Sequence, residues 1–131
     1  MANNIPSRIK VDSSKYGMFL DLRKNLSDKV VNSDVFSLSV AYGYKSENKV
    51  PLKSKKDFIN VISVSDELNS LILFIGLTEL GEKAIENPSE MYVLAEKYAN
   101  GGIDELYEDF TKSNGEFSLK MYDELMNINE K

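Results

Sequence analysis

Residues 65–81, SDELNSLILFIGLTELG, form the stretch on which the prediction of the fold depends. Ser65 is typical of a helix N-cap, and Gly81 is typical of a residue that ends a helix. Between them the sequence predicts a helix from Asp66 to about Leu80. Its apolar residues are Leu68, Leu71, Ile72, Leu73, Phe74, Ile75 and Leu77. Because they fall on nearly all sides of the helix, we expect it to lie in the centre of the fold.

The chain before this helix opens with a short alternating pattern of polar and apolar residues. Residues 8–12 predict a strand with its two apolar side chains on one face and Arg8, Lys10 and Asp12 on the other. The two serines that follow can cap a helix that reaches about residue 25. The start of the chain is therefore predicted as a strand followed by a helix.

A second helix is predicted from Asn32 or Ser33, with Gly43 ending it before a polar loop. A strand is the alternative for this segment, because β-branched residues and serines are frequent in it. Residues 57–64, DFINVISV, are compatible with either a short helix or a strand. The sequence leaves this choice open.

The chain after residue 81 reads as further helices. Asn87-Pro88-Ser89-Glu90 is a helix start, with Asn as the cap, Pro at the first helical position and Glu three residues after the cap. We expect this helix to run to Ala99, where Asn100-Gly101-Gly102 would end it. A short helix over 103–111 and a last helix over 116–127 are expected to follow. The sum is one domain, 1–131, mostly α, with about five to six helices and room for one short N-terminal strand.

The composition limits the chemistry that the protein can carry out. The chain has 131 residues, a mass of 14.8 kDa, no Cys and no His. It therefore lacks a thiolate nucleophile, an imidazole base and Cys- or His-based metal sites. A magnesium nuclease remains as an alternative, because residues 47–49, Glu-Asn-Lys, with Asp34 upstream match part of one nuclease pattern. Such a triplet arises readily by chance, so we predict no enzymatic activity, no cofactor and no metal site.

The charges divide the chain into two halves of opposite sign. Residues 1–65 hold 11 Lys and Arg against 6 Asp and Glu, a net charge of +5, whereas residues 66–131 hold 5 Lys against 15 Asp and Glu, a net charge of −10. A basic half can contact nucleic-acid phosphates, and an acidic half favours a protein partner, unless both are merely solvated surfaces. The predicted phosphate contacts are Arg8, Lys10, Lys45, Lys49, Lys53, Lys55 and Lys56.

The predicted strand–helix–helix at the N-terminus suggests a second mode of DNA binding. In ribbon-helix-helix proteins, two such strands pair across a dimer, and their outward side chains enter the DNA major groove. Here those side chains would be Arg8, Lys10 and Asp12, with Lys15 and either Arg23 or Lys24 near the phosphates. This mode requires a homodimer and would make the protein a transcriptional regulator.

Four segments together resemble a known family. They are DVF at 34–36, AYGYK at 41–45, VPL at 50–52 and AEKYANGGI at 95–103. Their order resembles the small proteins called DNA phosphorothioation-associated protein 4, or Dnd system-associated protein 4. The resemblance covers about residues 34–106. It implies a prokaryotic, intracellular accessory protein encoded beside DNA sulfur-modification or restriction machinery, with no established activity and no catalytic residues to carry over.

These observations predict a non-catalytic accessory protein of a phosphorothioation modification and restriction defence system. We expect duplex DNA at the basic half and a protein of the machinery at the acidic half. A protein–protein adaptor without DNA contact is the alternative, beside the ribbon-helix-helix regulator, and a homo-oligomer is left open. No secretory signal is seen at the N-terminus, and the longest apolar run, residues 71–77, is too short for a membrane span. We therefore expect a cytoplasmic protein with no membrane partner.

Overall fold

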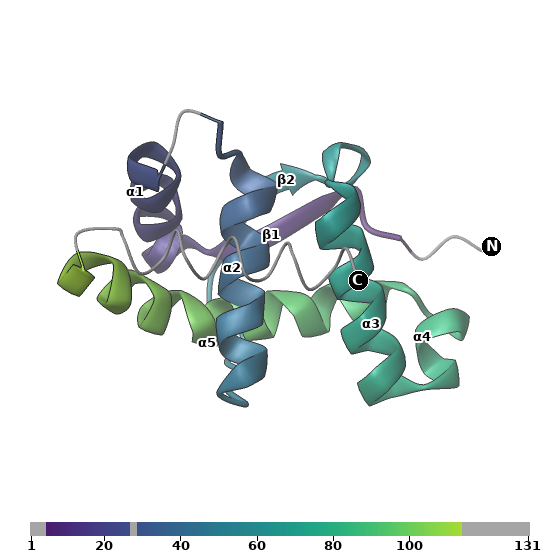
Figure 1. Ribbon diagram of the computed structural model, residues 1–131. Helices are drawn as coiled ribbons and strands as arrows, with labels where there is room; N and C mark the ends of the chain where they lie inside the picture. The colour runs from purple at the N-terminus through teal and green to yellow at the C-terminus, as the bar shows by residue number, and fades with distance from the viewer. Residues whose placement is uncertain (1–4, 27–28, 114–131) are drawn as a thin grey trace.

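The described residues build a helical protein with one small sheet, which confirms the predicted mostly α class (Figure 1). The computed structural model describes residues 5–26 and 29–113. The predicted helix over 116–127 lies outside them. The elements are β1 (Arg8–Asp12), η1 (Ser13–Lys15), α1 (Tyr16–Leu26), α2 (Asn32–Lys45), β2 (Lys55–Asn60), η2 (Val61–Ser63), α3 (Asp66–Leu80), α4 (Glu82–Glu86) and α5 (Ser89–Ser113).

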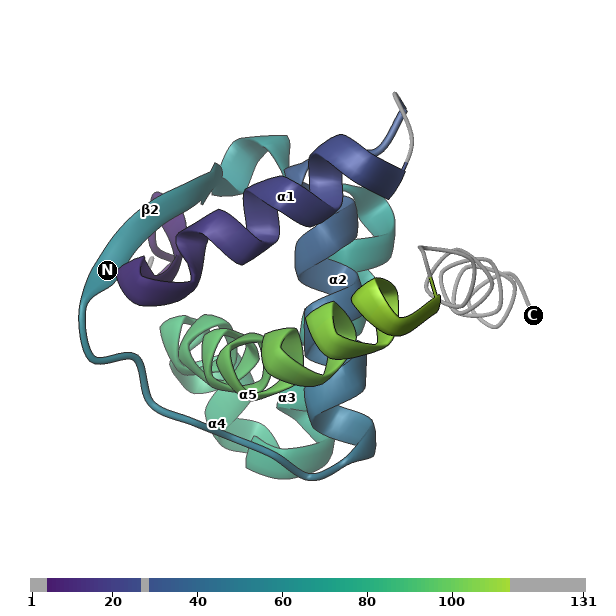
Figure 2. The ribbon, with the colours of Figure 1, turned by 90° about the vertical axis from the view of Figure 1, so that its left-hand side faces the viewer.

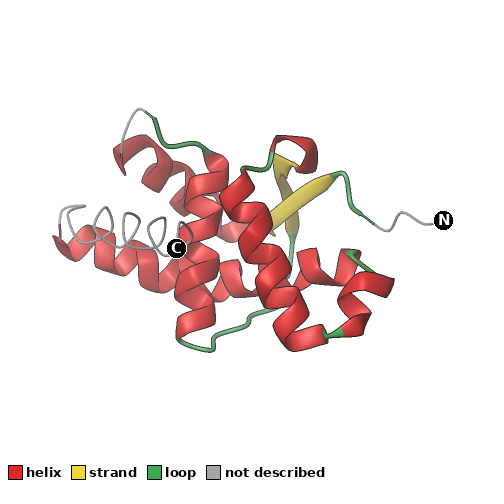
Figure 3. Ribbon diagram, turned by 45° about the vertical axis from the view of Figure 1, so that its right-hand side comes forward, coloured by secondary structure: helices red, strands yellow, loops and turns green. Residues whose placement is uncertain are grey.

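The predicted N-terminal strand exists, and it pairs with a second strand in the same chain. β1 and β2 form a two-stranded antiparallel sheet whose register shifts between Ile9 and Lys10. Residues 57–64 are thus a strand as far as Asn60, followed by the short 3-10 turn η2. The side chains of Ile9, Val11 and Phe58 are buried in the hydrophobic core. Figure 3 shows the two strands beside the helices, which make up most of the described chain.

The central helix of the described chain is α2. Val35, Phe36, Leu38 and Val40 are fully or almost fully buried, and so are three of its serines. Figure 2 shows α2 crossing α5, with α1 across the upper part of α2 and β2 at the left of the view. Because small serines occupy the positions between its large apolar residues, α2 can be buried on most sides without overpacking.

The longest helix is α5, and the prediction that residues 100–102 end it is wrong. α5 continues from Ser89 to Ser113, so no separate helix begins at residue 103. A Cβ on Gly102 would collide with the backbone of Ser39, and a Cβ on Gly43 would collide with the carbonyl group of Tyr98. The two glycines therefore let α2 and α5 cross in close contact, which outweighs the low helix propensity of glycine.

Gly43 corrects a second prediction in the same way. It does not end α2, which continues to Lys45, but lies inside the helix at the crossing with α5. The two charge-defined halves of the sequence are consequently not separate in space, since α2 belongs to one and α5 to the other.

The helix α3 has the predicted bounds, Ser65 as its cap and Gly81 at its end, but it does not lie in the centre. The Ser65 hydroxyl accepts a hydrogen bond from the Leu68 amide at 3.2 Å, and Gly81 has a positive φ of 61°. One face of α3 is buried against the core through Leu68, Ile72, Ile75 and Gly76. The opposite face carries large apolar side chains that remain exposed. The apolar composition of α3 therefore exceeds what the described fold buries.

Candidate binding site

The structure brings five of the seven predicted phosphate-contacting residues to the sheet and leaves two elsewhere. Arg8 and Lys10 lie on β1, Lys55 and Lys56 lie on β2, and Lys53 is held next to β1 through its backbone. The remaining two, Lys45 and Lys49, follow at the C-terminal end of α2. The predicted single basic surface is thus divided into two parts.

Carboxylates are interleaved with the basic residues of the sheet. The Arg8 Nε lies 3.9 Å from Asp57 Oδ2, and the Glu96 side chain accepts a hydrogen bond from the Lys10 amide at 2.8 Å. Burial raises the pKa of the Glu96 carboxyl, against the opposing effect of that hydrogen bond and of the positive charges of Lys10 and Lys55. The sheet therefore presents a surface of mixed charge. Its exposed cations are Arg8, Lys55 and Lys56, and Lys53 is exposed just before β2.

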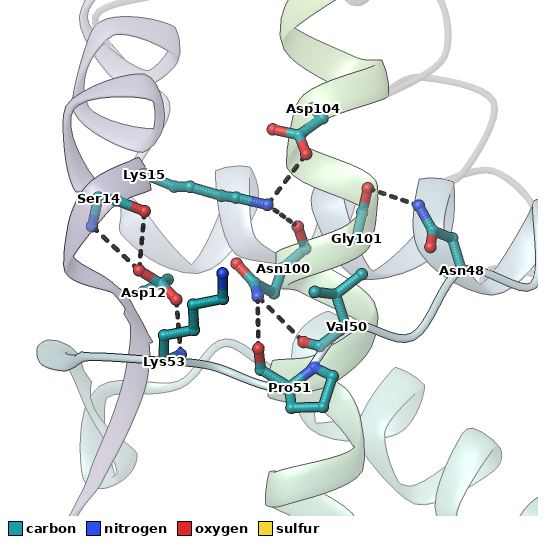
Figure 4. A network of polar contacts seen from close by, with 10 residues as sticks. All are labelled: Asp12, Ser14, Lys15, Asn48, Val50, Pro51, Lys53, Asn100, Gly101 and Asp104. Atoms are coloured by element: carbon teal, nitrogen blue, oxygen red, sulfur yellow. Dashed lines mark hydrogen bonds and ion pairs between the residues drawn. The ribbon is translucent and has the colours of Figure 1, made fainter.

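Asp12 does not join the outward side chains of β1, so that part of the prediction is wrong. It is 4% exposed, and its carboxylate accepts hydrogen bonds from the Ser14 amide at 3.1 Å and the Ser14 hydroxyl at 2.8 Å. Its other oxygen accepts from the Lys53 amide at 2.7 Å (Figure 4). The Lys53 and Ser14 hydrogen bonds lower the pKa of Asp12 to about 2. Asp12 thus joins β1 to the segment that leads into β2.

The segment between α2 and β2 is held against α5 by hydrogen bonds from asparagine side chains. Asn100 Nδ2 donates to the Val50 and Pro51 carbonyl groups at 3.0 and 3.2 Å, and Asn48 Nδ2 donates to the Gly101 carbonyl at 3.2 Å (Figure 4). A Cβ on Gly101 would collide with the Asn48 backbone. We call residues 48–53 the strap. Its lysines lie on a backbone held against α5 and not on a free loop.

Lys15 extends the same network to the next turn of α5. Its ammonium donates to the Asn100 carbonyl at 2.8 Å and pairs with Asp104 at 2.9 Å. The expected separate helix over 103–111 would place Asp104 in a first turn, but Asp104 lies in the interior of α5. The predicted phosphate contact Lys15 is therefore engaged by a carboxylate of the acidic half.

A pocket that the sequence did not suggest lies between α2, α3 and α5. It has a volume of about 480 Å³ and is lined by Tyr44, Glu47, Lys49, Glu79 and Tyr98. The Lys49 ammonium lies 3.4 Å from Glu79 Oε1 and 5.7 Å from the centre of the Tyr98 ring. We call this the tyrosine pocket. Local patterns could not reveal it, because its five residues come from three parts of the chain.

Next to this pocket is an exposed apolar surface. Leu73, Phe74 and Leu77 are 48%, 59% and 42% exposed, and their spacing places them on one side of α3. The Phe74 ring meets the edge of Tyr44, with 6.4 Å between ring centres. We call these three residues the α3 apolar face. It adjoins the tyrosine pocket through the Tyr44–Phe74 contact.

The residues of the nuclease alternative do not come together. Asp34 lies in the first turn of α2 and Glu47 lies after its end, which separates them by about 20 Å along a helix of this length. Within residues 5–26 and 29–113, no three Asp or Glu side chains are placed to hold a metal ion. In the same ranges, no helix is long and apolar enough to cross a membrane.

The segments that resemble the phosphorothioation-associated family meet in space. Segments 41–45 and 95–103 contain Gly43 and Gly102, which form the close crossing of α2 and α5. These segments therefore have a packing role in this chain. The assignment to the phosphorothioation-associated family stays a prediction. In the comparisons with known proteins, no family model, no curated protein and no solved structure matches the chain.

Proposed function

We propose that this protein is a non-catalytic accessory protein that assembles with a protein partner through the α3 apolar face. The observation that carries the proposal is the exposure of Leu73, Phe74 and Leu77 together on one helix. Single exposed apolar residues are ordinary, but a contiguous group of them is typical of a protein interaction site. The context of a phosphorothioation modification and restriction system is proposed from the resemblance of the four segments.

The charges around this face indicate the chemistry of the partner. α3 contains Asp66, Glu67 and Glu79 and no Lys or Arg. Asp66 and Glu67 flank the apolar face at the start of α3, so two copies of α3 packed in parallel would bring their acidic ends together, which is unfavourable. A partner helix with an apolar stripe and flanking Lys or Arg residues would complement both features. We therefore propose a basic amphipathic helix as the occupant.

The test uses the purified proteins encoded by the genes that flank this one, among which the proposal expects modification and restriction proteins, measured singly by titration calorimetry. The double variant Leu73→Lys/Leu77→Lys should lose at least about tenfold in affinity for the partner, because it places two cations in the apolar contact and repels a basic partner. Val31→Lys is the matched control, since Val31 is 54% exposed at the start of α2. Equal binding by the double variant and the wild type would refute the proposal.

Two further results would also overturn this assignment. If none of those proteins binds the wild type, the proposed context is wrong. If light scattering shows a dimer that the double variant loses, the occupant is a second copy of this chain.

Contact with the DNA backbone is a second candidate, favoured by the exposure of Lys53, Lys55 and Lys56 at the entry to β2. Flexible lysines in such a group suit sequence-independent contact with phosphates. The carboxylates of Asp57 and Glu96 beside the β1–β2 sheet oppose the binding of DNA phosphates there. The ribbon-helix-helix mode has less support, because β1 already pairs with β2 and Asp12 is buried.

A further inference from the structure

We propose that the tyrosine pocket is a receptor for an alkylammonium or guanidinium group, and that Lys49 occupies it in the free protein. The pocket combines two aromatic rings with two carboxylates, Glu47 and Glu79. Aromatic faces and carboxylates both attract cations, and their combination is the usual chemistry of a site that recognises an organic cation. This inference does not depend on the α3 apolar face.

The position of Lys49 shows how a cation fits the pocket. Its ammonium lies 3.4 Å from Glu79 Oε1, within ion-pair distance, and 5.7 Å from the Tyr98 ring centre, within the range of a cation–π contact. One ammonium thus uses the carboxylate and the aromatic surface together. A Lys or Arg side chain from outside the chain could use the same two groups.

Lys49 can leave this position without disturbing the backbone around it. Its side chain is 47% exposed, and it lies in the strap and not in a helix. The residues on both sides are fixed by backbone hydrogen bonds, from the Asn48 amide to the Gly43 carbonyl at 2.8 Å and from the Val50 amide to the Lys97 carbonyl at 3.0 Å. Displacement of the ammonium therefore requires only side-chain rotation.

The walls of the pocket are held in place independently of Lys49. The Tyr98 hydroxyl donates a hydrogen bond to Glu79 Oε2, and the Tyr98 ring meets Tyr44 edge to face, with 5.4 Å between ring centres. Burial, with the hydrogen bond to Glu79 and its charge, raises the pKa of the Tyr98 hydroxyl, so it remains a donor at neutral pH. Glu79 keeps its second oxygen for a cation. The pocket is therefore preformed for its ligand.

The experiment titrates the ¹⁵N-labelled protein with N-acetyl-lysine methylamide and follows the amide and tyrosine ring resonances by NMR. Chemical shift changes should centre on Tyr44, Glu79 and Tyr98. Lys49→Ala removes the internal competitor, and it should bind the probe about two- to fivefold more tightly than the wild type, as expected for loss of one exposed ion pair. Lys53→Ala is the matched control, because Lys53 lies in the same strap away from the pocket, and it should bind as the wild type does.

Two variants in the Lys49→Ala background test the carboxylates. Glu79→Gln should lose most of the binding, and Glu47→Gln should weaken it less, because Lys49 pairs with Glu79. Glu47 is exposed, so its variant keeps the test valid if Glu79→Gln fails to fold in a thermal melt. Unchanged binding in a folded Glu79→Gln protein, or in Glu47→Gln if only that variant folds, would refute the assignment.

The choice of probes separates the sources of the cation. N-acetyl-arginine methylamide carries a guanidinium group, and spermidine carries alkylammonium groups. Whichever of the three ligands binds most tightly identifies a protein side chain or a polyamine as the source of the cation. The analogue acetylated at its ε-amine has the same stem without the charge and should not bind. Shifts of equal size with that analogue, or equal affinity in Lys49→Ala and the wild type, would overturn the proposal.

Discussion

At the scale of single residues, Asp12 shows how a polar side chain can hold two segments together. Residue alternation places it with Arg8 and Lys10, but its carboxylate is the acceptor for donors on Ser14 and on Lys53. A buried carboxylate is tolerated because these donors replace the water that it loses. The sequence pattern could not predict this, because Lys53 lies far from Asp12 along the chain.

We expect Asp12→Asn to lower the free energy of unfolding by about 1–2 kcal/mol at pH 7, because an amide accepts these hydrogen bonds less well than a carboxylate. The pKa of Asp12 is about 2 in the folded protein and ordinarily 3.8, so its contribution is complete above pH 3.8 and is lost as the pH falls toward 2. Urea unfolding at pH 7 and at pH 2.5 should therefore show the difference between variant and wild type shrinking at the lower pH.

The matched control for this measurement is Asp57→Asn. Asp57 is an exposed carboxylate on the neighbouring strand, and its ion pair with Arg8 is long, at 3.9 Å. Its replacement should change stability little, since exposed ion pairs contribute little. A difference for Asp12→Asn that stays constant between the two pH values would contradict the proposed role of its charge.

At the scale of elements, the sequence predicts a helix start or end correctly where the signal depends only on neighbouring residues. Ser65 caps α3, and Asn87 Nδ2 donates to the Glu90 side chain at 2.9 Å at the start of α5. The prediction of a helix end at Gly101 and Gly102 is wrong, because the same dipeptide that commonly ends a helix can also permit a close helix crossing. Only the position of α2 distinguishes the two roles.

Gly102→Ala should destabilise the protein by about 2–3 kcal/mol, because the added Cβ would collide with the backbone of Ser39 and Gly43. Gly17→Ala is the control with the opposite sign. It lies in the first turn of α1 with open space around the added Cβ, so it should stabilise the protein by about 0.4–1 kcal/mol. Thermal or urea unfolding of both variants checks this, and a stabilising Gly102→Ala would contradict the crossing.

At the scale of the whole molecule, the sequence predicted the mostly α class but not the surfaces. Counting charges by halves assumed that residues near in sequence share a face. The fold instead places Glu96, Asp104 and Glu79 of the acidic half next to Lys10, Lys15 and Lys49 of the basic half. The α3 apolar face was read as core for a similar reason, since composition alone does not say which side of a helix is covered.

The DNA candidate predicts a salt dependence that maps the remaining basic surface. If the wild type binds duplex DNA, Lys53→Gln/Lys55→Gln/Lys56→Gln should reduce the slope of log affinity against log salt by about 2–3, because each lost phosphate contact removes about 0.9. Lys45→Gln/Lys49→Gln should leave that slope unchanged. Fluorescence anisotropy with a labelled duplex measures both, and no binding by the wild type at low salt would remove this candidate.

The strap connects the tyrosine pocket to the basic residues at the start of β2. It carries Lys49 at one end and Lys53 at the other, and Asn100 anchors its middle to α5. Only three residues separate Lys49 from Lys53, so a short backbone segment links the two lysines. If a polyanion bound at Lys53 changes the affinity of the pocket for an amine, then the amine must change the affinity of the protein for the polyanion by the same factor.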